Sequence, residues 1–325
     1  MSDGPSTILV TGATGFIGHQ VVHRLLAHPA RPRLRLLAHE TDVPDCCAAT
    51  APVVRGSLTD PASLREVCRG VDTVLHLASA ITQDPAHAHA VNAEGAENLL
   101  AEARRSGVRR FVRLSTAAVY GQGPHQGGPP PSERPLSVTS ASRLAGDRSV
   151  LDAGGVVLRP YLVYGAGDVW VLPALVKMIT LLPRWIEGGR ARLSLISVDD
   201  LARVTAALAT RPTPLPASAV LHAAHPRPVA VRDLVTTICR YLGLPLPLGN
   251  MSSADLAERF GGSADPALAL RLAQFATDHW YDSAPLWSLA GLEPGPGIAE
   301  HFAACAPWYR EHLRDLVPAA LPPAA

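Results

Sequence analysis

Three glycines near the start of the chain have the spacing of a phosphate-binding turn. Gly12, Gly15 and Gly18 lie between an apolar run at residues 7–10 and a helical pattern at residues 16–26. Glycine allows a tight turn and a close approach of the backbone to a ligand, and a helix N-terminus offers unpaired N–H groups and a positive dipole to an anion. The pattern predicts binding of a dinucleotide through its pyrophosphate.

The elements that position this turn alternate along the first half of the chain. Further short aliphatic runs predict strands at residues 34–38, 53–54, 73–77, 110–115 and 156–159. Helical patterns lie between them at residues 63–68, 88–105 and 138–151. Strands and helices in this order form a parallel sheet with helices on both faces. We therefore predict an α/β fold, a doubly wound parallel Rossmann sheet with a smaller, mostly helical C-terminal substrate-binding domain.

The predicted domain boundaries follow from this order. Residues 1–165, joined by about 193–225, form the dinucleotide-binding domain, and residues 166–192 with 226–318 form a substrate-binding cap. Glycine and proline dominate residues 121–135, which predicts a loop near the strand ends where ligands bind. Residues 319–325 are low in complexity and are expected to be a flexible tail.

Composition limits the partners to small molecules. Of 325 residues, 47% are hydrophobic and 18% are charged, and the formal net charge is +1. A chain without a basic surface is a poor partner for nucleic acid or an acidic membrane surface. The most apolar stretch, residues 169–185, is broken by prolines and basic residues and is shorter than the roughly 20 apolar residues that span a bilayer. We expect a cytoplasmic protein without nucleic-acid or membrane partners; monomer and homodimer stay open.

The cysteines indicate a reducing compartment and no metal site. Their number, five, is odd, and they lack the paired short spacings of a zinc site. Cys46 and Cys47 are adjacent, and we expect them in a loop or at a strand end. No metal is therefore predicted.

Beyond the glycine turn, several segments resemble those of the extended short-chain dehydrogenases/reductases, the NAD-dependent epimerase/dehydratase family. They keep the family's order: GSLTD at 56–60, VDTVLHLAS at 71–79, VNAEGAENLL at 91–100, RLSTAAVYG at 113–121, VLRPYLVYGAGD at 157–168, ISVDDLA at 196–202 and PWYREHL at 307–313. The resemblance covers nearly the whole chain and implies an NAD(P)H-dependent oxidoreductase acting on a ketone or CH–OH group. It implies cofactor contacts from Gly12, Thr14, Gly15, Phe16, Ile17, Gly18, His39, Ser57, Leu58, Leu77, Ala78, Ser79, Asn92, Arg143, Pro160 and Val163.

Cofactor preference follows from the end of the second strand. An acidic residue there bonds the adenosine ribose and selects NAD, but by the resemblance this position falls near Ala38, which has no carboxylate. His39 comes next, where NADP users of the family often place a basic residue, while Glu40 argues mildly for NAD. We expect NADP(H), with NAD(H) possible. Ser57 replaces an aspartate of the family, so Ser57 or the Leu58 backbone is expected to contact adenine.

The resemblance breaks at the catalytic pair. The family places a tyrosine and a lysine four residues apart on one helix face, where the tyrosine protonates the forming alkoxide and the lysine lowers its pKa and holds the nicotinamide ribose. Thr139 and Arg143 occupy these positions here. An aliphatic alcohol cannot be tuned toward neutral pH as a phenol can, and arginine stays charged above a pH of about 12. Neither replacement preserves the chemistry, although Arg143 can still hold ribose or phosphate oxygens.

Thr116 is the best remaining candidate for hydrogen-bonding a substrate carbonyl. The family's third polar residue, four places before the Tyr120 of its VYG motif, falls on Thr116; the alternative is that Ser115 and Thr116 only end a strand. A ketone beside a phenol in the same substrate does not need a protein acid, because the phenol polarises the carbonyl and meets its developing charge. We therefore expect substrate-assisted reduction.

The cap is expected to enclose an apolar aromatic ligand. Residues 169–185 are rich in large apolar side chains and offer only two basic groups for the diphosphate of a nucleotide sugar, and ordinary core packing is the alternative for about half of them. The residues expected to contact substrate are Ser79, Ile81, Ala117, Tyr164, Trp170, Leu175 and Met178.

These observations favour an NADPH-dependent ketoreductase. By resemblance to a family member that also lacks the tyrosine and lysine, the substrate is a ring ketone of a polycyclic aromatic, angucyclinone-like polyketide, reduced to a secondary alcohol. Two alternatives stay open. A nucleotide-sugar epimerase or dehydratase shares the fold but needs a proton-abstracting residue that Thr139 cannot supply. A non-catalytic NADP-binding regulator tolerates the loss of both residues.

Overall fold

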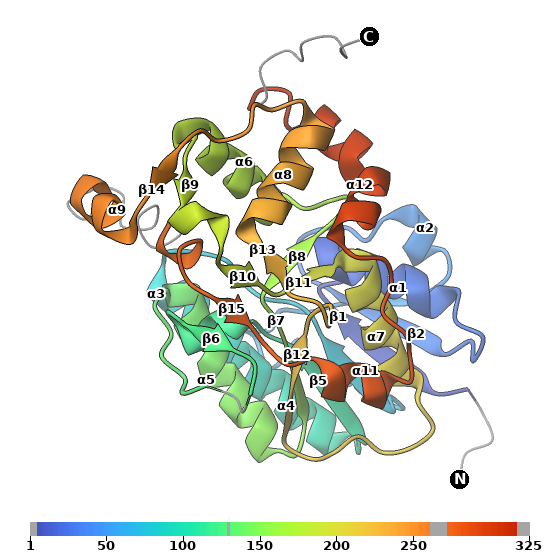
Figure 1. Cartoon of the computed structure of the whole chain (residues 1–325). Coiled ribbons are helices and arrows are strands. Elements are labelled where there is room, and N and C mark those ends of the chain that lie inside the picture. Colours follow the sequence, from blue (N-terminus) through green and yellow to red (C-terminus); the bar gives the residue numbers. More distant parts are fainter. Residues whose placement is uncertain (1–4, 129–130, 261–271, 317–325) are drawn as a thin grey trace.

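The computed structural model describes residues 5–128, 131–260 and 272–316, and a seven-stranded parallel sheet lies at its centre (Figure 1). The strand order is β12-β7-β5-β4-β1-β2-β3. The strands are β1 (Thr7–Thr11), β2 (Arg33–Ala38), β3 (Val53–Arg55), β4 (Thr73–His76), β5 (Arg110–Leu114), β7 (Val156–Pro160) and β12 (Ala219–Ala223). The predicted doubly wound α/β sheet is confirmed.

The chain reverses its direction of travel across the sheet at β1. Val10 of β1 is in register with Leu36 of β2 on one side and with Leu75 of β4 on the other. The chain runs from β1 through β2 to β3 and then returns to β4 on the opposite side. The carboxyl ends of β1 and β4 therefore form the switch point at which sheets of this kind bind ligands.

Helices cover both faces of the sheet because the strand side chains alternate. Ile8 and Val10 pack with α1 (Phe16–Leu26) and α7 (Val198–Thr210). Leu9, one residue out of phase, packs on the other face with α4 (Gly95–Arg105) and α5 (Val138–Asp152). This two-sided burial explains why the strands are nearly continuous apolar runs in the sequence.

Residues 63–68 are not the helix that the pattern predicts. They form successive turns, in which the N–H groups of Arg65 and Val67 bond the carbonyls of Ala62 and Leu64, three residues back. Glu66 has φ 66°, a left-handed conformation that ends any α-helix at that point. Leu64 and Val67 still pack into the core, which accounts for the helix-like apolar spacing.

The long helix predicted at residues 88–105 is three segments joined end to end. It begins at Pro85 with α3 (Pro85–His89), widens into a π-helical turn, η1 (Ala90–Glu94), and continues as α4. Asp84 caps its start by accepting hydrogen bonds from the N–H groups of Ala86 and His87. The π turn contains Asn92, and turns of this kind often occur at functional sites.

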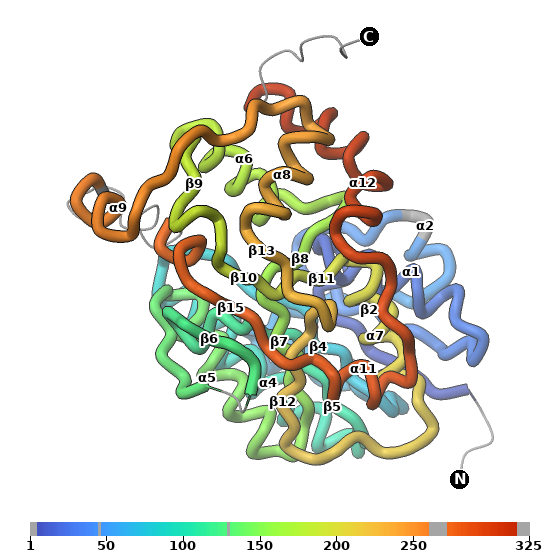
Figure 2. Tube along the Cα trace, in the orientation of Figure 1, coloured from blue at the N-terminus to red at the C-terminus, as the bar shows by residue number. Residues whose placement is uncertain are grey.

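The region predicted to form the cap contains helices with a core of their own. The helices α6 (Val171–Leu181), α8 (Val231–Leu242) and α12 (Ile298–His312) share one apolar core and lie together at one end of the sheet (Figure 1). Figure 2 shows β15 (His279–Trp280) beside β6 (His125–Gln126), although more than 150 residues separate them. The others are α2 (Asp45–Ala48), η2 (Ala117–Tyr120), β8 (Leu162–Tyr164), β9 (Trp185–Ile186), η3 (Glu187–Gly189), β10 (Arg192–Leu193), β11 (Leu195–Ser197), β13 (Val229–Ala230), β14 (Asn250–Met251), α9 (Ser253–Phe260) and α11 (Ala284–Ala290).

A buried carboxylate ties the cap to the sheet. Asp168 follows β8 and accepts three hydrogen bonds of 2.8 Å from N–H groups at the start of α6. Tyr309 of α12 donates its hydroxyl hydrogen to the same carboxylate at 3.0 Å and accepts the Gly165 N–H at 2.9 Å. Two segments of the family pattern, VLRPYLVYGAGD and PWYREHL, thus meet in space.

Some expectations fall at the limits of the described chain. The tail at residues 319–325 lies outside it. The expected loop at 121–135 contains the short strand β6, and Cys46 and Cys47 lie on the helix α2 instead of in a loop or at a strand end. Within residues 5–128, 131–260 and 272–316, no helix combines the length and apolarity needed to cross a membrane.

Candidate active site

The glycine turn joins β1 to α1 at the switch point of the sheet. Gly12 has φ +71°, and a Cβ there would lie 2.6 Å from the nitrogen of Ala78. A Cβ on Gly18 would lie 2.0 Å from the carbonyl oxygen of Gly12. These two glycines are therefore required by the fold itself, since neither neighbour is a side chain that could move.

Gly15 differs from both, because the fold leaves room beside it. A Cβ there would have Gly12 O as its nearest neighbour, at 3.5 Å, and the backbone is extended with φ −80°. Gly15 is the N-cap of α1 and provides no side-chain hydrogen bond to the N–H groups of the first turn. A glycine that packing does not require, placed before uncapped N–H groups, fits the close approach of a pyrophosphate.

The segment after β4 forms the other wall of this turn. Thr11 accepts the Ala78 N–H at 3.2 Å and bonds His76 Nδ1 at 2.9 Å. Leu77 donates its N–H to the Thr11 carbonyl at 3.3 Å. The predicted cofactor residues Leu77, Ala78 and Gly12 are thus brought together at the carboxyl ends of β1 and β4.

Two basic residues, His39 after β2 and Arg55 at the end of β3, lie near the end of β2. His39 is exposed, and its carbonyl accepts a hydrogen bond from Arg55 Nη1 at 2.9 Å. Arg55 ends β3 beside Ala38 and also pairs with Asp42. Arg55 was not among the predicted cofactor residues, although it is a basic residue directly before the GSLTD segment.

The predicted adenine contacts take part in local turns. The Ser57 hydroxyl bonds Thr59 Oγ1 at 2.8 Å, and its backbone N–H donates to Ser63 Oγ, also at 2.8 Å. The Leu58 carbonyl accepts a hydrogen bond from Asn98 at 2.9 Å. Both residues lie on the loop that follows β3, and their contact with adenine stays a prediction.

The helix α5 presents Thr139 and Arg143 as the sequence predicts. Ser137 and Ser140 form a reciprocal capping box that sets where this helix begins. Thr139 Oγ1 donates to the Thr82 carbonyl at 3.3 Å, so its proton is engaged by the backbone of the segment after β4. A hydroxyl held in this way is poorly placed to protonate a substrate.

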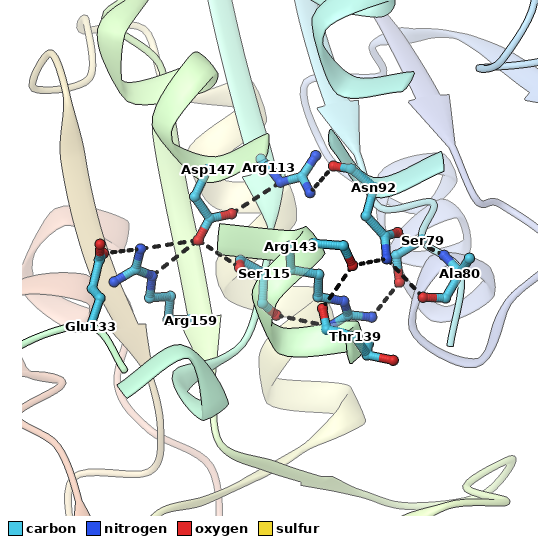
Figure 3. Close-up of polar contacts among 11 residues, drawn as sticks. Ser79, Ala80, Asn92, Arg113, Ser115, Glu133, Thr139, Arg143, Asp147 and Arg159 are labelled. Carbon is cyan, nitrogen blue, oxygen red and sulfur yellow. Dashed lines mark hydrogen bonds and ion pairs between the residues drawn. The ribbon is translucent and has the colours of Figure 1, made fainter. Parts of the chain in front are cut away.

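The Arg143 guanidinium is held between the ends of two strands (Figure 3). Its Nη2 donates to the Ser79 hydroxyl, and its Nη1 donates to the Ser115 carbonyl at 3.4 Å. Its Nε is buried and bonds no atom of the described chain. Burial, and after it the positive charge of Arg113, lowers the pKa of Arg143 to about 10. Arg143 is therefore still a cation at neutral pH.

Asn92 fixes the backbone of this region. Its Oδ1 accepts the Ala80 N–H at 2.8 Å, while its Nδ2 donates to the Ala80 carbonyl at 2.9 Å and to the Ser142 hydroxyl at 3.0 Å. The side chain is fully buried, and these contacts satisfy it within the protein. Asn92 therefore positions the segment that carries Ser79, and a direct cofactor contact from it stays a prediction.

A buried network of ion pairs joins α5 to the strands β5 and β7 (Figure 3). Asp147 is fully buried and bonds Arg113 Nε at 3.1 Å, Arg159 Nη2 at 3.0 Å and the Ser115 hydroxyl at 2.7 Å. Glu133 accepts from Arg159 at 2.7 Å. No role was predicted for the charged members of this network, although arginines within the apolar strands β5 and β7 indicate buried cations that need acidic partners.

Thr116 lies at the end of β5 as the N-cap of η2. Its Oγ1 accepts the Ala118 N–H at 3.1 Å, which leaves the hydroxyl hydrogen without an acceptor among the described residues. In contrast to Thr139, this hydroxyl can donate to a carbonyl oxygen. Tyr120, the last residue of η2, is buried and bonds His222 Nε2 at 2.7 Å, which fits a structural role.

The residues predicted to contact substrate differ in how exposed their side chains are. Ile81 and Trp170 are 50% and 55% exposed, whereas Ala117 and Tyr164 are buried. Leu175 and Met178 line a small apolar cavity of about 40 Å³ within the cap, together with Trp185 and Phe275. Core packing therefore accounts for part of this set, as the alternative interpretation held.

A larger cavity lies at the other end of the sheet. It has a volume of about 380 Å³ and is lined by Asp72, Thr73, Arg110 and Phe111, at the amino ends of β4 and β5. Ligands of doubly wound sheets bind at the carboxyl ends, and Arg110 already donates to three backbone carbonyls there. This cavity is not part of the candidate site.

The donor set of the site fits a dinucleotide cofactor. The glycine turn presents the uncapped N–H groups of α1 to a pyrophosphate, Arg143 and Ser79 offer donors for a ribose, and Arg55 beside His39 offers positive charge for an adenosine phosphate. The side chains and backbone at the switch point therefore match NAD(P)(H).

Comparison with known protein families also indicates a nicotinamide dinucleotide cofactor. The model of a family described as the NAD dependent epimerase/dehydratase family matches residues 8–222. This range runs from β1 to β12 and contains the glycine turn, Thr116, Thr139 and Arg143.

Two curated relatives are reductases of ketones by name. A 4-hydroxy-2-methyl-3-oxo-4-farnesyl-3,4-dihydroquinoline-1-oxide ketoreductase of Stigmatella aurantiaca is 31% identical over 289 residues, which cover 82% of this chain and 85% of that protein. A 2-alkyl-3-oxoalkanoate reductase of Stenotrophomonas maltophilia is 27% identical and covers 90% of this chain and 96% of its own length.

The solved structures share the fold. A dTDP-glucose 4,6-dehydratase double mutant from Streptomyces venezuelae, solved with NAD bound, has a TM-score of 0.73 at 22% identity and covers 95% of this chain and 99% of that one. At this identity the likeness supports the architecture and leaves the reaction to the residues of the site.

Proposed function

The chain belongs to the NAD dependent epimerase/dehydratase family and is an NAD(P)H-dependent oxidoreductase, and we propose that it is a ketoreductase that works without a protein acid. One observation carries the proposal. The glycine turn has the geometry of a phosphate-binding turn. The Thr139 hydroxyl donates its hydrogen to the Thr82 carbonyl, whereas the Thr116 hydroxyl hydrogen has no acceptor among the described residues. The site can therefore hold a cofactor and orient a carbonyl, but it lacks the proton-transfer pair that epimerases and dehydratases of this fold require.

In the proposed reaction, the residues of this chain bind the cofactor and orient the ketone. When bound, NADPH supplies the hydride. Thr116 donates a hydrogen bond to the ketone oxygen, and Arg143 with Ser79 holds the nicotinamide ribose. The carbonyl carbon accepts the hydride, and the oxygen takes a proton from a phenol of the same substrate, which is reprotonated from solvent. Positioning and local hydrogen bonds then supply the rate enhancement.

We propose a ring ketone of a polycyclic aromatic polyketide as the substrate, reduced to a secondary alcohol. The missing tyrosine and lysine within an otherwise complete family pattern resemble the angucyclinone ketoreductase of simocyclinone antibiotic biosynthesis. The apolar segment at residues 169–185 supports an aromatic ligand over a nucleotide sugar, because it offers little charge for a diphosphate and leaves Trp170 exposed. The two ketone-reducing relatives support the reaction class.

We propose NADPH as the preferred cofactor. The Ala38 position has no acid for a ribose hydroxyl, and His39 and Arg55 place two basic groups near the end of β2. The dissociation constants of NADPH and NADH, measured by fluorescence titration, test this preference. NADPH should bind more tightly than NADH, and Arg55→Ser should bring the two dissociation constants closer together. A wild-type chain that binds both equally contradicts it.

The oxidation of NADPH, followed by absorbance with a panel of phenolic polycyclic ketones, tests the proposed function. We expect turnover of ketones whose carbonyl lies beside a free phenol, and loss of turnover when the same phenol is methylated. Equal turnover of the methylated ketones would overturn substrate assistance alone. Turnover of no ketone despite NADPH binding would overturn the reductase and favour a non-catalytic regulator, and conversion of dTDP- or UDP-glucose would favour a dehydratase or epimerase.

A further inference from the structure

Three side chains with metal-binding atoms meet between α1 and α2. His19 and His23 lie four residues apart on α1, and Cys47 comes from α2 after β2. One ligating atom from each lies within 4.8 Å of the other two. The cysteine spacing could not indicate this cluster, since its members come from two separate elements.

The distances match those between ligands of a tetrahedral ion. His19 Nε2 and His23 Nε2 are 3.1 Å apart, and Cys47 Sγ lies 3.9 Å from His23 Nε2. Zinc bound at about 2.0–2.1 Å from nitrogen and about 2.3 Å from sulfur places two nitrogens about 3.3 Å apart and nitrogen and sulfur about 3.6 Å apart. Small movements of three side chains would therefore complete the geometry.

The local chemistry also suits a metal ion. The Nε2 atoms of the two rings face each other at 3.1 Å, and an imidazole nitrogen that carries no hydrogen offers its lone pair to an ion. The Cys47 side chain is buried, where a thiolate is stable only with a cation beside it.

We propose that His19, His23 and Cys47 bind one divalent transition metal of the zinc type, with water as the fourth ligand. Two imidazoles four residues apart on a helix chelate such ions, and a thiolate selects zinc over magnesium or calcium. The ion would join α1, which starts at the glycine turn, to the connection between β2 and β3, which starts at His39. It would thus stabilise the segment beside the adenosine end of the cofactor site, independently of the reaction proposed above.

Cobalt(II) is the probe that tests the site. The tag-free full-length chain, stripped with a chelator, should bind one Co²⁺ with tetrahedral d–d absorption and a thiolate-to-cobalt charge-transfer band, and Zn²⁺ should displace it. Cys47→Ser should abolish the charge-transfer band, and His23→Gln should weaken binding by more than about 100-fold, since even loss of an outer-shell partner costs roughly 10- to 100-fold. Cys305→Ser and His87→Gln are the matched controls and should change nothing.

A second measurement covers variants that fold poorly. Zn²⁺ should raise the thermal midpoint of the wild-type chain and of both controls, because it binds only the folded state, and it should protect Cys47 from alkylation as detected by mass spectrometry. A wild-type chain that shows only the octahedral spectrum of free Co²⁺, or a charge-transfer band that persists in Cys47→Ser, would overturn the proposal.

Discussion

The cofactor turn and the catalytic face of α5 belong to the sequence pattern of one family, yet they are built differently. Backbone atoms specify the turn: a Cβ on Gly12 or Gly18 would meet Ala78 N or Gly12 O. Side chains specify the catalytic face, where Thr139 and Arg143 stand on a helix held by Asp147. Gly12 and Gly18 of the first region cannot change without loss of the fold, whereas the second region can change its side chains while keeping its backbone.

Glycine substitutions should separate packing from binding within the cofactor turn, and they give the largest effects. Gly18→Ala forces a Cβ to within 2.0 Å of a carbonyl oxygen, so we expect a loss of at least about 3 kcal/mol of unfolding free energy or no folded protein. Gly15→Ala should fold normally, because its Cβ has room, but should bind NADPH at least about tenfold more weakly.

Circular dichroism with urea unfolding and NADPH fluorescence titration measure the two quantities. If Gly15→Ala bound NADPH as the wild type does, the pyrophosphate would not pass over this glycine, and the assignment of the turn would fail.

Asp147→Asn tests the support of the catalytic face. It leaves the buried Arg113 and Arg159 without their carboxylate, and breaking a buried pair costs about 3–5 kcal/mol. Asp42→Asn is the control, since its ion pair with Arg55 is exposed and worth at most about 1 kcal/mol. Urea unfolding of both variants measures the difference. Equal, small losses would mean that the network does not hold α5.

A buried imidazole lies next to each region, since His76 bonds Thr11 before the glycine turn and His222 bonds Tyr120 of η2, so acid tests the packing around both. Burial lowers the pKa of His222 to about 4 and that of His76 well below its usual value. Below a pH of about 6.5 the unfolded chain takes up these protons while the folded chain does not, so stability should fall as the pH drops from about 6.5 to 4.

The contribution of His222 to that fall is up to about 3 kcal/mol. His222→Gln should reduce the drop in unfolding free energy between pH 7 and pH 4.5, and the exposed His87→Gln should not. An unchanged drop in the His222 variant would show that this imidazole is protonated in the folded state.

The two regions also differ in how far the sequence could predict them. The glycine turn and most strands follow from local rules, because alternation, apolar runs and glycine spacing act over a few residues. These rules predicted a helix at residues 63–68, which is wrong because Glu66 adopts a positive φ that no pattern of apolar residues reveals.

Local sequence patterns could not predict the contacts between segments that are distant in the sequence. Arg55 beside His39, Asp147 between Arg113 and Arg159, and Cys47 beside His23 each depend on how separate elements pack. The family resemblance and the helix predicted at residues 138–151 placed Thr139 and Arg143, but the bond from the Thr139 hydroxyl to the Thr82 carbonyl was not predictable.

The rate of hydride transfer in Thr139→Ala and Thr116→Ala, measured in single turnovers with saturating NADPH and a phenolic ketone, tests the central claim most directly. We expect Thr139→Ala to stay within about threefold of the wild type, since general acid catalysis typically contributes about 100-fold or more and Thr139 supplies none. Thr116→Ala should be slower by about tenfold, from one lost hydrogen bond to the carbonyl. A loss of 100-fold or more in Thr139→Ala would contradict the account and make this hydroxyl the proton donor.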